Sequence, residues 1–149
     1  GRYVFVAKRE LEGVPLFGAA VRACGHIFID RQDHTRAVES LEGARRALEE
    51  TRPTIIMFPE GTRSATGELQ PFKKGAFVLA IQTGVEVVPA AISGSRAVMR
   101  KHAWRIRPGT VRVRFGTPIP VGEYGLGQRD ELTARARAAL LRLRSEDPE

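Results

Sequence analysis

Short apolar segments of strand length alternate with amphipathic segments of helix length along most of this chain. A strand followed by a helix and a second strand favours a crossover that leaves the two strands parallel in one sheet. We therefore predict an α/β fold with a mixed, largely parallel sheet flanked by helices. A length of 149 residues suits a single domain over 1–149. The predicted strands cover 3–7, 27–29, 54–58, 86–92 and 110–115, and the predicted helices about 15–24, 35–50, 75–82 and 130–144.

Single residues set several of the expected boundaries. Pro15 suits the first turn of a helix, and Gly25 and Gly84 suit C-terminal caps because glycine adopts a positive φ without strain. Pro89 has no N–H for a strand ladder, so it predicts a bulge or an edge. Cys24 falls in an apolar helical pattern and is expected to be buried. As the only cysteine, it excludes an internal disulfide and a cysteine-based zinc cluster.

The segment at 54–58 is continuous and β-branched, which makes it the clearest candidate for a buried strand. It runs directly into Phe-Pro-Glu-Gly-Thr-Arg-Ser at 58–64. In open α/β sheets, ligands bind beyond the carboxyl ends of the strands, which is where this loop is expected. A second polar pair, Asp30 and Arg31, follows the strand at 27–29 and is expected at the same edge.

The loop at 58–64 has the residue types that a phosphomonoester requires. Such a group needs a planar cationic fork, backbone N–H groups free to approach and no side chain in the way. Arg63 supplies the fork, Gly61 lets the backbone come close, and Thr62 and Ser64 add hydroxyl donors. Glu60 can orient an arginine or accept a hydroxyl from a polyol. The alternative is an ordinary turn with a surface ion pair.

Two lysines stand in front of the helix at 75–82, although the macrodipole disfavours cations there unless an anion is present. Lys73 is the better candidate ligand, because Lys74 can point away. Lys8 follows the first strand and is a third candidate at the same edge. For each lysine, a solvated surface position is the alternative.

The formal charge of +7 and the pI near 10.5 indicate an anionic partner. Between Val87 and Gly122 there is no acidic residue, and Trp104 lies among seven lysines and arginines: Arg96, Arg100, Lys101, Arg105, Arg107, Arg112 and Arg114. Basic residues grouped around a tryptophan fit a surface that contacts an anionic membrane. A nucleic-acid face would need more aromatic residues and a recognisable module, so no nucleic acid is expected. A solvated basic surface is the remaining alternative.

No apolar run is long enough to span a bilayer, and no signal peptide opens the sequence. The first residue is Gly1, followed at once by a strand pattern, which predicts that the sequence continues upstream. No catalytic triad, metal cluster or nucleotide-binding glycine loop is present. Only His34 precedes an acid in a His-x4-acid pattern: four residues separate it from Glu39, at the start of a predicted helix, and it is not expected to be catalytic.

Three blocks together resemble the glycerolipid acyltransferases, the 1-acylglycerol-3-phosphate (lysophosphatidic acid) acyltransferase family. They are the segments GHIFIDR at 25–31, FPEGTRS at 58–64 and VVPAAI at 87–92, and the resemblance extends over about 3–120. VAKREL at 6–11, PLFG at 15–18 and FKKG at 72–75 also resemble the family. The block at 58–64 is the most specific of them.

The resemblance implies transfer of a fatty acyl group from acyl-CoA or acyl carrier protein to the free hydroxyl of lysophosphatidic acid. It implies that Arg31, Glu60, Gly61 and Arg63 bind the glycerol phosphate of this acceptor, with help from Lys8 and Lys73. Neither a metal nor a cofactor is implied. The implied location is the cytoplasmic face of a membrane.

The family's first block, His-x4-Asp, supplies the general base and the acid that orients it, and these 149 residues do not contain it. His34 follows the second block and cannot replace it. No catalytic residue is therefore expected in this chain, and residues 1–149 alone are expected to be inactive. Another lysophospholipid, glycerol 3-phosphate or an ornithine lipid is an alternative acceptor. A non-catalytic lipid-binding or nucleic-acid-binding module is a further alternative.

Overall fold

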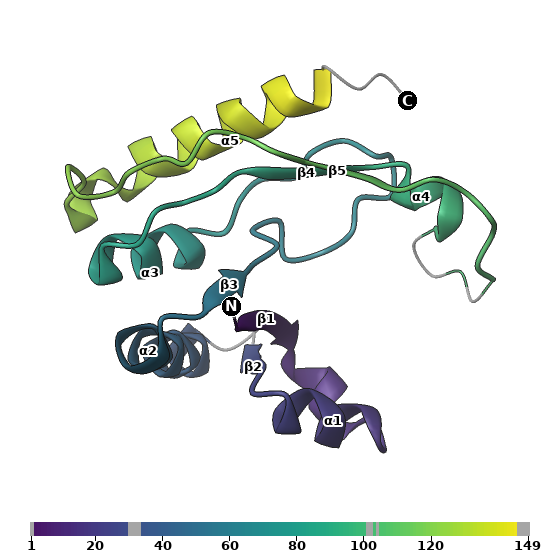
Figure 1. Cartoon of the computed structure of the whole chain (residues 1–149), viewed down its shortest axis with the longest axis horizontal. Coiled ribbons are helices and arrows are strands. Elements are labelled where there is room, and N and C mark those ends of the chain that lie inside the picture. The colour runs from purple at the N-terminus through teal and green to yellow at the C-terminus, as the bar shows by residue number, and fades with distance from the viewer. Residues whose placement is uncertain (1, 30–33, 101–102, 104, 146–149) are drawn as a thin grey trace. The chain divides into compact units, whose positions relative to one another are not determined.

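The computed structural model describes residues 2–29, 34–100, 103 and 105–145. These form two compact units, Gly1–Gly61 and Thr62–Glu149. The expected α/β class is confirmed, because helices alternate with both parallel and antiparallel strand pairs (Figure 1). Among the described residues, no helix combines the length and the apolar character that a membrane span requires.

The first unit is built on a three-stranded parallel sheet. The central strand β1 (Tyr3–Lys8) lies between β2 (Ile27–Ile29) and β3 (Thr54–Ile56). Side chains alternate along β1, with Val4 and Val6 buried between more exposed neighbours. Helix α2 (His34–Thr51) adds Ala44 and Leu48, four residues apart and both buried on one face of the helix.

Strand β3 differs from its prediction in length and burial. It ends at Ile56, and Phe58 is 54% exposed. Thr54 is exposed, and Ile55 and Ile56 are only half-buried. The expectation of a buried strand is therefore wrong, because β3 lies at the edge of the β2-β1-β3 sheet.

A 3-10 helix (Arg9–Gly13) and α1 (Phe17–Ala23) follow β1. The predicted cap at Gly25 is confirmed: its φ is 73°, its N–H donates to Arg22 O at 2.8 Å, and the His26 N–H donates to Val21 O at 3.1 Å. These two bonds form a Schellman motif. Two expectations are wrong here. Pro15 lies before the helix, and Cys24 is exposed because it is the capping residue beyond the last turn.

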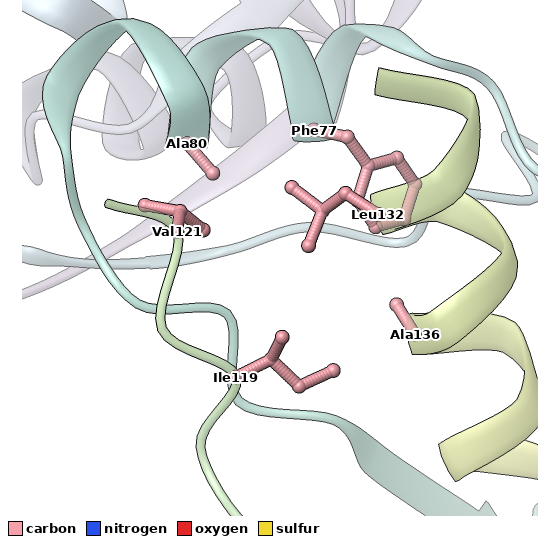
Figure 2. Packing of buried hydrophobic residues seen from close by; sticks show 6 residues of the cluster. All are labelled: Phe77, Ala80, Ile119, Val121, Leu132 and Ala136. Carbon is pink, nitrogen blue, oxygen red and sulfur yellow. The ribbon is translucent and has the colours of Figure 1, made fainter. Parts of the chain in front are cut away.

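The second unit holds a buried apolar cluster, which lies between two helices and an irregular strand-like segment. Helix α3 (Gly75–Thr83) ends at Gly84, whose left-handed conformation confirms the predicted cap. Helix α5 (Arg129–Ser145) packs against α3, preceded by a 3-10 turn (Leu126–Gln128). Figure 2 shows the cluster that they bury, which consists of Phe77, Ala80, Ile119, Val121, Leu132 and Ala136.

Strands β4 (Ala90–Ser93) and β5 (Arg112–Phe115) pair antiparallel and are joined through the short helix α4 (Ser95–Val98). Val87 also bridges to Ile119, whereas Ala90 pairs with Phe115. The chain advances three residues from Val87 to Ala90 but four residues from Phe115 to Ile119 on the opposite strand. The extra residue is the offset of a β-bulge. The irregularity predicted at Pro89 is confirmed, and its carbonyl accepts the Gly116 N–H at 2.8 Å.

Candidate functional site

A tight turn follows β3. The Gly61 N–H donates to the Phe58 carbonyl at 3.0 Å, which closes a four-residue turn with Pro59 at its second position. The fixed φ of proline suits that position. Gly61 has a φ of 71°, a conformation that costs other residues about 1–2 kcal/mol. Glycine is therefore required for the turn geometry as well as for access to the backbone.

The parallel register places this turn at the predicted edge of the first unit's sheet. Lys8 is the last residue of β1 and pairs with Ile29, the last residue of β2. Ile56, the last residue of β3, pairs with Phe5 in the same direction. The chain therefore leaves all three strands at the carboxyl edge, as expected for a ligand-binding edge. Arg31 lies outside the described residues.

In the second unit, Thr62 and Arg63 are exposed and open a long loop. Within the described part of the chain, the Arg63 side chain has no hydrogen bond or ion pair, so its guanidinium is available to a ligand. The half-buried Ser64 Oγ accepts the Gly67 N–H at 3.0 Å and lies 3.3 Å from Thr66 Oγ1. Thr66 Oγ1 also accepts the Glu68 N–H at 3.3 Å. The hydroxyl oxygen of Ser64 thus helps to fold the loop, and its role as a hydrogen-bond donor to a ligand stays a prediction.

Two arginines from distant elements hold the same loop. Arg96 Nη1, from α4, donates to the Thr66 carbonyl at 2.6 Å. Arg144 Nη2, from the last turn of α5, donates to the Gly67 carbonyl at 2.8 Å. Sequence reasoning counted Arg96 only as part of a basic segment and did not single out Arg144, because partners 30 and 77 residues apart leave no local signal.

The two lysines before α3 are distinguished by their contacts. Lys74 Nζ lies 2.8 Å from Asp130 Oδ1, in the first turn of α5. Its hydrogen bond lowers the pKa of the Asp130 carboxyl. Lys73 is exposed and has no such partner among the described residues. Phe72 stacks against the buried Phe77 with ring centroids 6.1 Å apart, which anchors the backbone that carries Lys73.

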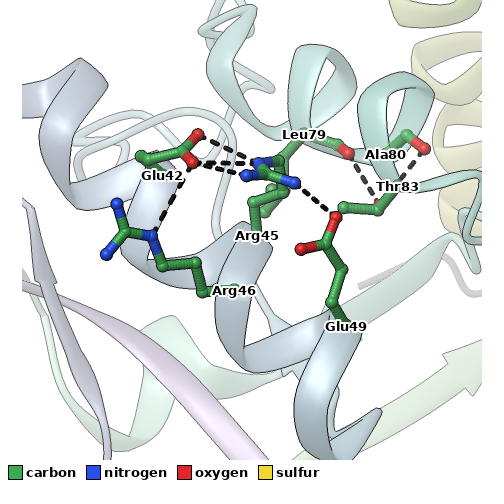
Figure 3. A network of polar contacts seen from close by, with 7 residues as sticks. All are labelled: Glu42, Arg45, Arg46, Glu49, Leu79, Ala80 and Thr83. Atoms are coloured by element: carbon green, nitrogen blue, oxygen red, sulfur yellow. Dashed lines mark hydrogen bonds and ion pairs between the residues drawn. The ribbon is translucent and has the colours of Figure 1, made fainter.

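The polar network on α2 belongs to the helix and not to the predicted site. Figure 3 shows Arg45 between Glu42 and Glu49, with Arg46 also directed at Glu42. Hydrogen bonding with Glu42 raises the pKa of Arg45, and the same contact lowers the pKa of Glu42. The spacings are i,i+3 and i,i+4, as in ordinary surface pairs along a helix.

His26 also has a structural contact. Its Nδ1 accepts the Phe5 N–H at 3.3 Å, and the two rings meet edge to face with centroids 5.3 Å apart. This contact joins the start of β2 to β1. His34 is the first residue of α2, and His102 lies outside the described residues.

The predicted ligands are thus divided between the two units: Lys8, Glu60 and Gly61 belong to the first, and Thr62, Arg63 and Lys73 to the second. Within each unit they occupy positions that could bind an anion, at the carboxyl edge of the sheet and along the loop before α3. Their convergence on one phosphate stays a prediction.

The chain belongs to the acyltransferase family, because the sequence model described as Acyltransferase matches residues 1–93. Its fold is similar to the crystal structure of the 1-acyl-sn-glycerophosphate acyltransferase PlsC from Thermotoga maritima. The TM-score is 0.81 at 29% identity, over 98% of this chain and 57% of that one.

Curated relatives agree with this assignment. The chain is 39% identical to a 1-acyl-sn-glycerol-3-phosphate acyltransferase of Cocos nucifera. The alignment covers 81% of this chain and 39% of that protein. It is 36% identical to the enzyme of the same name from Escherichia coli K12 over 92% of its length and 55% of that protein's. The human alpha enzyme is 35% identical over 95% of this chain and 50% of its own length. The chain thus spans about half the length of the curated relatives it matches.

Proposed function

We propose that this chain forms the acceptor-binding part of a 1-acyl-sn-glycerol-3-phosphate acyltransferase. The enzyme transfers a fatty acyl group from acyl-CoA or acyl carrier protein to the free hydroxyl of lysophosphatidic acid and forms phosphatidic acid, a step of phospholipid biosynthesis. The names of its relatives and its family membership support this reaction. The observation that carries the acceptor assignment is the exposed guanidinium of Arg63, which has no partner among the described residues. It lies on a loop whose carbonyl groups accept hydrogen bonds from two arginine side chains.

Each predicted ligand has a distinct part in binding the acceptor. Arg63 pairs with the phosphate through its planar fork, and Arg31 adds a second cation. The left-handed Gly61 leaves room for the phosphate next to the backbone, and Thr62 adds a hydroxyl donor. Glu60 orients an arginine or accepts a glycerol hydroxyl.

Lys8 and Lys73 bring further positive charge to the same phosphate. Lys73 is the better placed of the two lysines before α3, since the charge of Lys74 is already paired with Asp130. The Lys73 side chain is exposed, so its ammonium group is accessible to a ligand.

The reaction needs a base that these residues do not supply. The acceptor hydroxyl oxygen attacks the thioester carbonyl, its proton passes to the base, and the thiol leaves. The resemblance assigns the base to a His-x4-Asp block upstream of Lys8. In this proposal, the present chain binds and orients the acceptor so that its hydroxyl faces that block.

A lysophospholipid acceptor requires contact with a membrane, and the basic segment after β4 supports such a contact. Met99 and Ile106 are exposed, the latter by 69%, and Arg100, Arg105 and Arg107 are exposed beside them. Apolar and basic side chains together favour an anionic lipid surface. We place this surface at the cytoplasmic face. Trp104 lies outside the described residues.

The acceptor assignment is tested in the full-length protein with Arg63→Lys and Arg63→Gln. Loss of the bidentate fork is expected to raise the KM for lysophosphatidic acid by roughly tenfold or more, with the donor KM unchanged. Unchanged acceptor kinetics would refute the role of Arg63.

Two substrate comparisons complete the test. A panel with lysophosphatidic acid, glycerol 3-phosphate, another lysophospholipid and an ornithine lipid identifies the acceptor. Parallel assays with acyl-CoA and acyl carrier protein identify the donor.

A further inference from the structure

The loop that carries Arg63 is fixed by side chains that lie outside the sequence blocks shared with the family. Thr66 and Gly67 have consecutive carbonyl groups, and each accepts one guanidinium hydrogen bond, from Arg96 and Arg144 respectively. Both arginines lie in the same unit as Arg63. Hydrogen bonds from a charged donor are stronger than those between neutral groups.

The loop has little freedom left once these bonds form. The Gly67 N–H is bound by Ser64 Oγ and its carbonyl by Arg144, so both sides of this residue are held. Gly67 has a φ of 94°, and a Cβ built there would lie 3.2 Å from Arg96 Nη1. Ser64 directly follows Arg63, so the fixed segment begins one residue after the proposed phosphate ligand.

We propose that Arg96 and Arg144 are positioning residues that fix the loop at 64–68 and thereby determine where Arg63 presents its guanidinium to the acceptor phosphate. This inference rests on the proposed function. Neither arginine needs to touch the acceptor. Their guanidinium groups donate to backbone carbonyl groups of the loop. They affect acceptor binding only by fixing the position of Arg63.

The test uses Arg96→Gln, Arg144→Gln and the double variant in the full-length protein, with Arg142→Gln as the matched control. Arg142 is an exposed arginine in the same last turn of α5. The double variant is expected to raise the KM for lysophosphatidic acid on the order of tenfold and to leave the acyl-donor KM unchanged. The Arg142→Gln control is expected to match the unmodified protein in both its acceptor KM and its acyl-donor KM.

A double-mutant cycle with Arg63→Gln separates positioning from general weakening of the fold. If the two arginines act through Arg63, replacing them in the Arg63→Gln background should raise the KM for lysophosphatidic acid only slightly further. The same fold-increase in both backgrounds, or an unchanged acceptor KM, would overturn the inference. Arg144→Lys keeps a positively charged donor, whereas Arg144→Gln leaves a neutral one, so the lysine variant is expected to keep most of the affinity for the acceptor. Equal loss with lysine and glutamine would also overturn it, and this comparison holds even if the double variant does not fold.

The two proposals fail in different ways. If Arg63→Gln leaves the acceptor KM unchanged, the acceptor site itself is wrongly assigned. If Arg63→Gln raises that KM while the Arg96 and Arg144 variants do not, only the positioning role is lost.

Discussion

Lys74 Nζ lies 2.8 Å from Asp130 Oδ1 and joins the N-terminus of α3 to the first turn of α5. The pair lies at the end of the helix interface that buries Phe77 and Leu132. A carboxylate in the first turn of α5 also favours that helix through its macrodipole. The ion pair is exposed to solvent, and it links the two helices that enclose the core.

This pair gives the stability a dependence on acidic pH. The folded-state pKa of Asp130 is lowered below 3.8, chiefly by the hydrogen bond from Lys74. Its contribution is therefore fully present above pH 3.8 and is lost as the pH falls through the lower, folded-state value. We expect Lys74→Gln to lower the thermal unfolding midpoint at pH 6, with a difference that shrinks as the pH falls below 3.8. A pH-independent difference, or an equal effect of Lys74→Gln in an Asp130→Asn background, would contradict this.

A second prediction concerns Gly18, whose added Cβ would lie 2.0 Å from the Glu12 carbonyl oxygen. Because the contact is with backbone, Gly18→Ala must displace α1 from the preceding 3-10 helix and is expected to cost about 1–3 kcal/mol. Gly43→Ala is the matched control, since nothing lies within 4 Å of its Cβ in the interior of α2. Gly43→Ala is expected to raise the free energy of unfolding by about 0.5–1 kcal/mol. Urea unfolding should show changes of opposite sign.

The core of the second unit predicts a large effect at Leu132. This side chain is 0% exposed, between Phe77 and Ala136 of the same cluster (Figure 2). Leu132→Ala should reduce the free energy of unfolding by about 2–5 kcal/mol through the lost burial and the cavity left behind. Leu141→Ala, in the same helix but 42% exposed, should cost far less. Similar losses at the two positions would show that this cluster is not the stabilising core.

The turn after β3 predicts an ordered series at Gly61. With a φ of 71°, Gly61→Ala should cost about 1–2 kcal/mol of local stability and raise the acceptor KM. Gly61→Asn should be milder, because asparagine tolerates the left-handed region. Steady-state kinetics on the three proteins check the order glycine, asparagine, alanine. An alanine variant with the acceptor KM of the unmodified protein would show that this geometry is not needed for binding.

Features governed by local geometry were predicted from the sequence. Gly25 and Gly84 end their helices because the required positive φ is a property of one residue and its neighbours. The irregularity at Pro89 follows equally from its missing N–H. The preference for Lys73 over Lys74 as a ligand stays a prediction, and the pairing of Lys74 with Asp130 supports it.

Features that depend on distant partners were not predicted. The apolar sequence of β3 indicates a strand, but not that it lies at the edge of the three-stranded sheet and is half-exposed. The exposure of Cys24 depends on where α1 ends. The bonds from Arg96 and Arg144 depend on how α4 and α5 return to the loop, which no spacing in the sequence encodes. Whether Arg31 and Arg63 meet at one phosphate stays a prediction.

The bond from Arg144 to the Gly67 carbonyl spans 77 residues and has a consequence for biosynthesis. During translation, the loop beside Arg63 emerges from the ribosome well before α5 has been made. It cannot accept the bond from Arg144 until α5 has emerged and docked. Acceptor binding is therefore expected only after Arg144 has been made, and nascent chains stalled before Arg144 are expected to lack it.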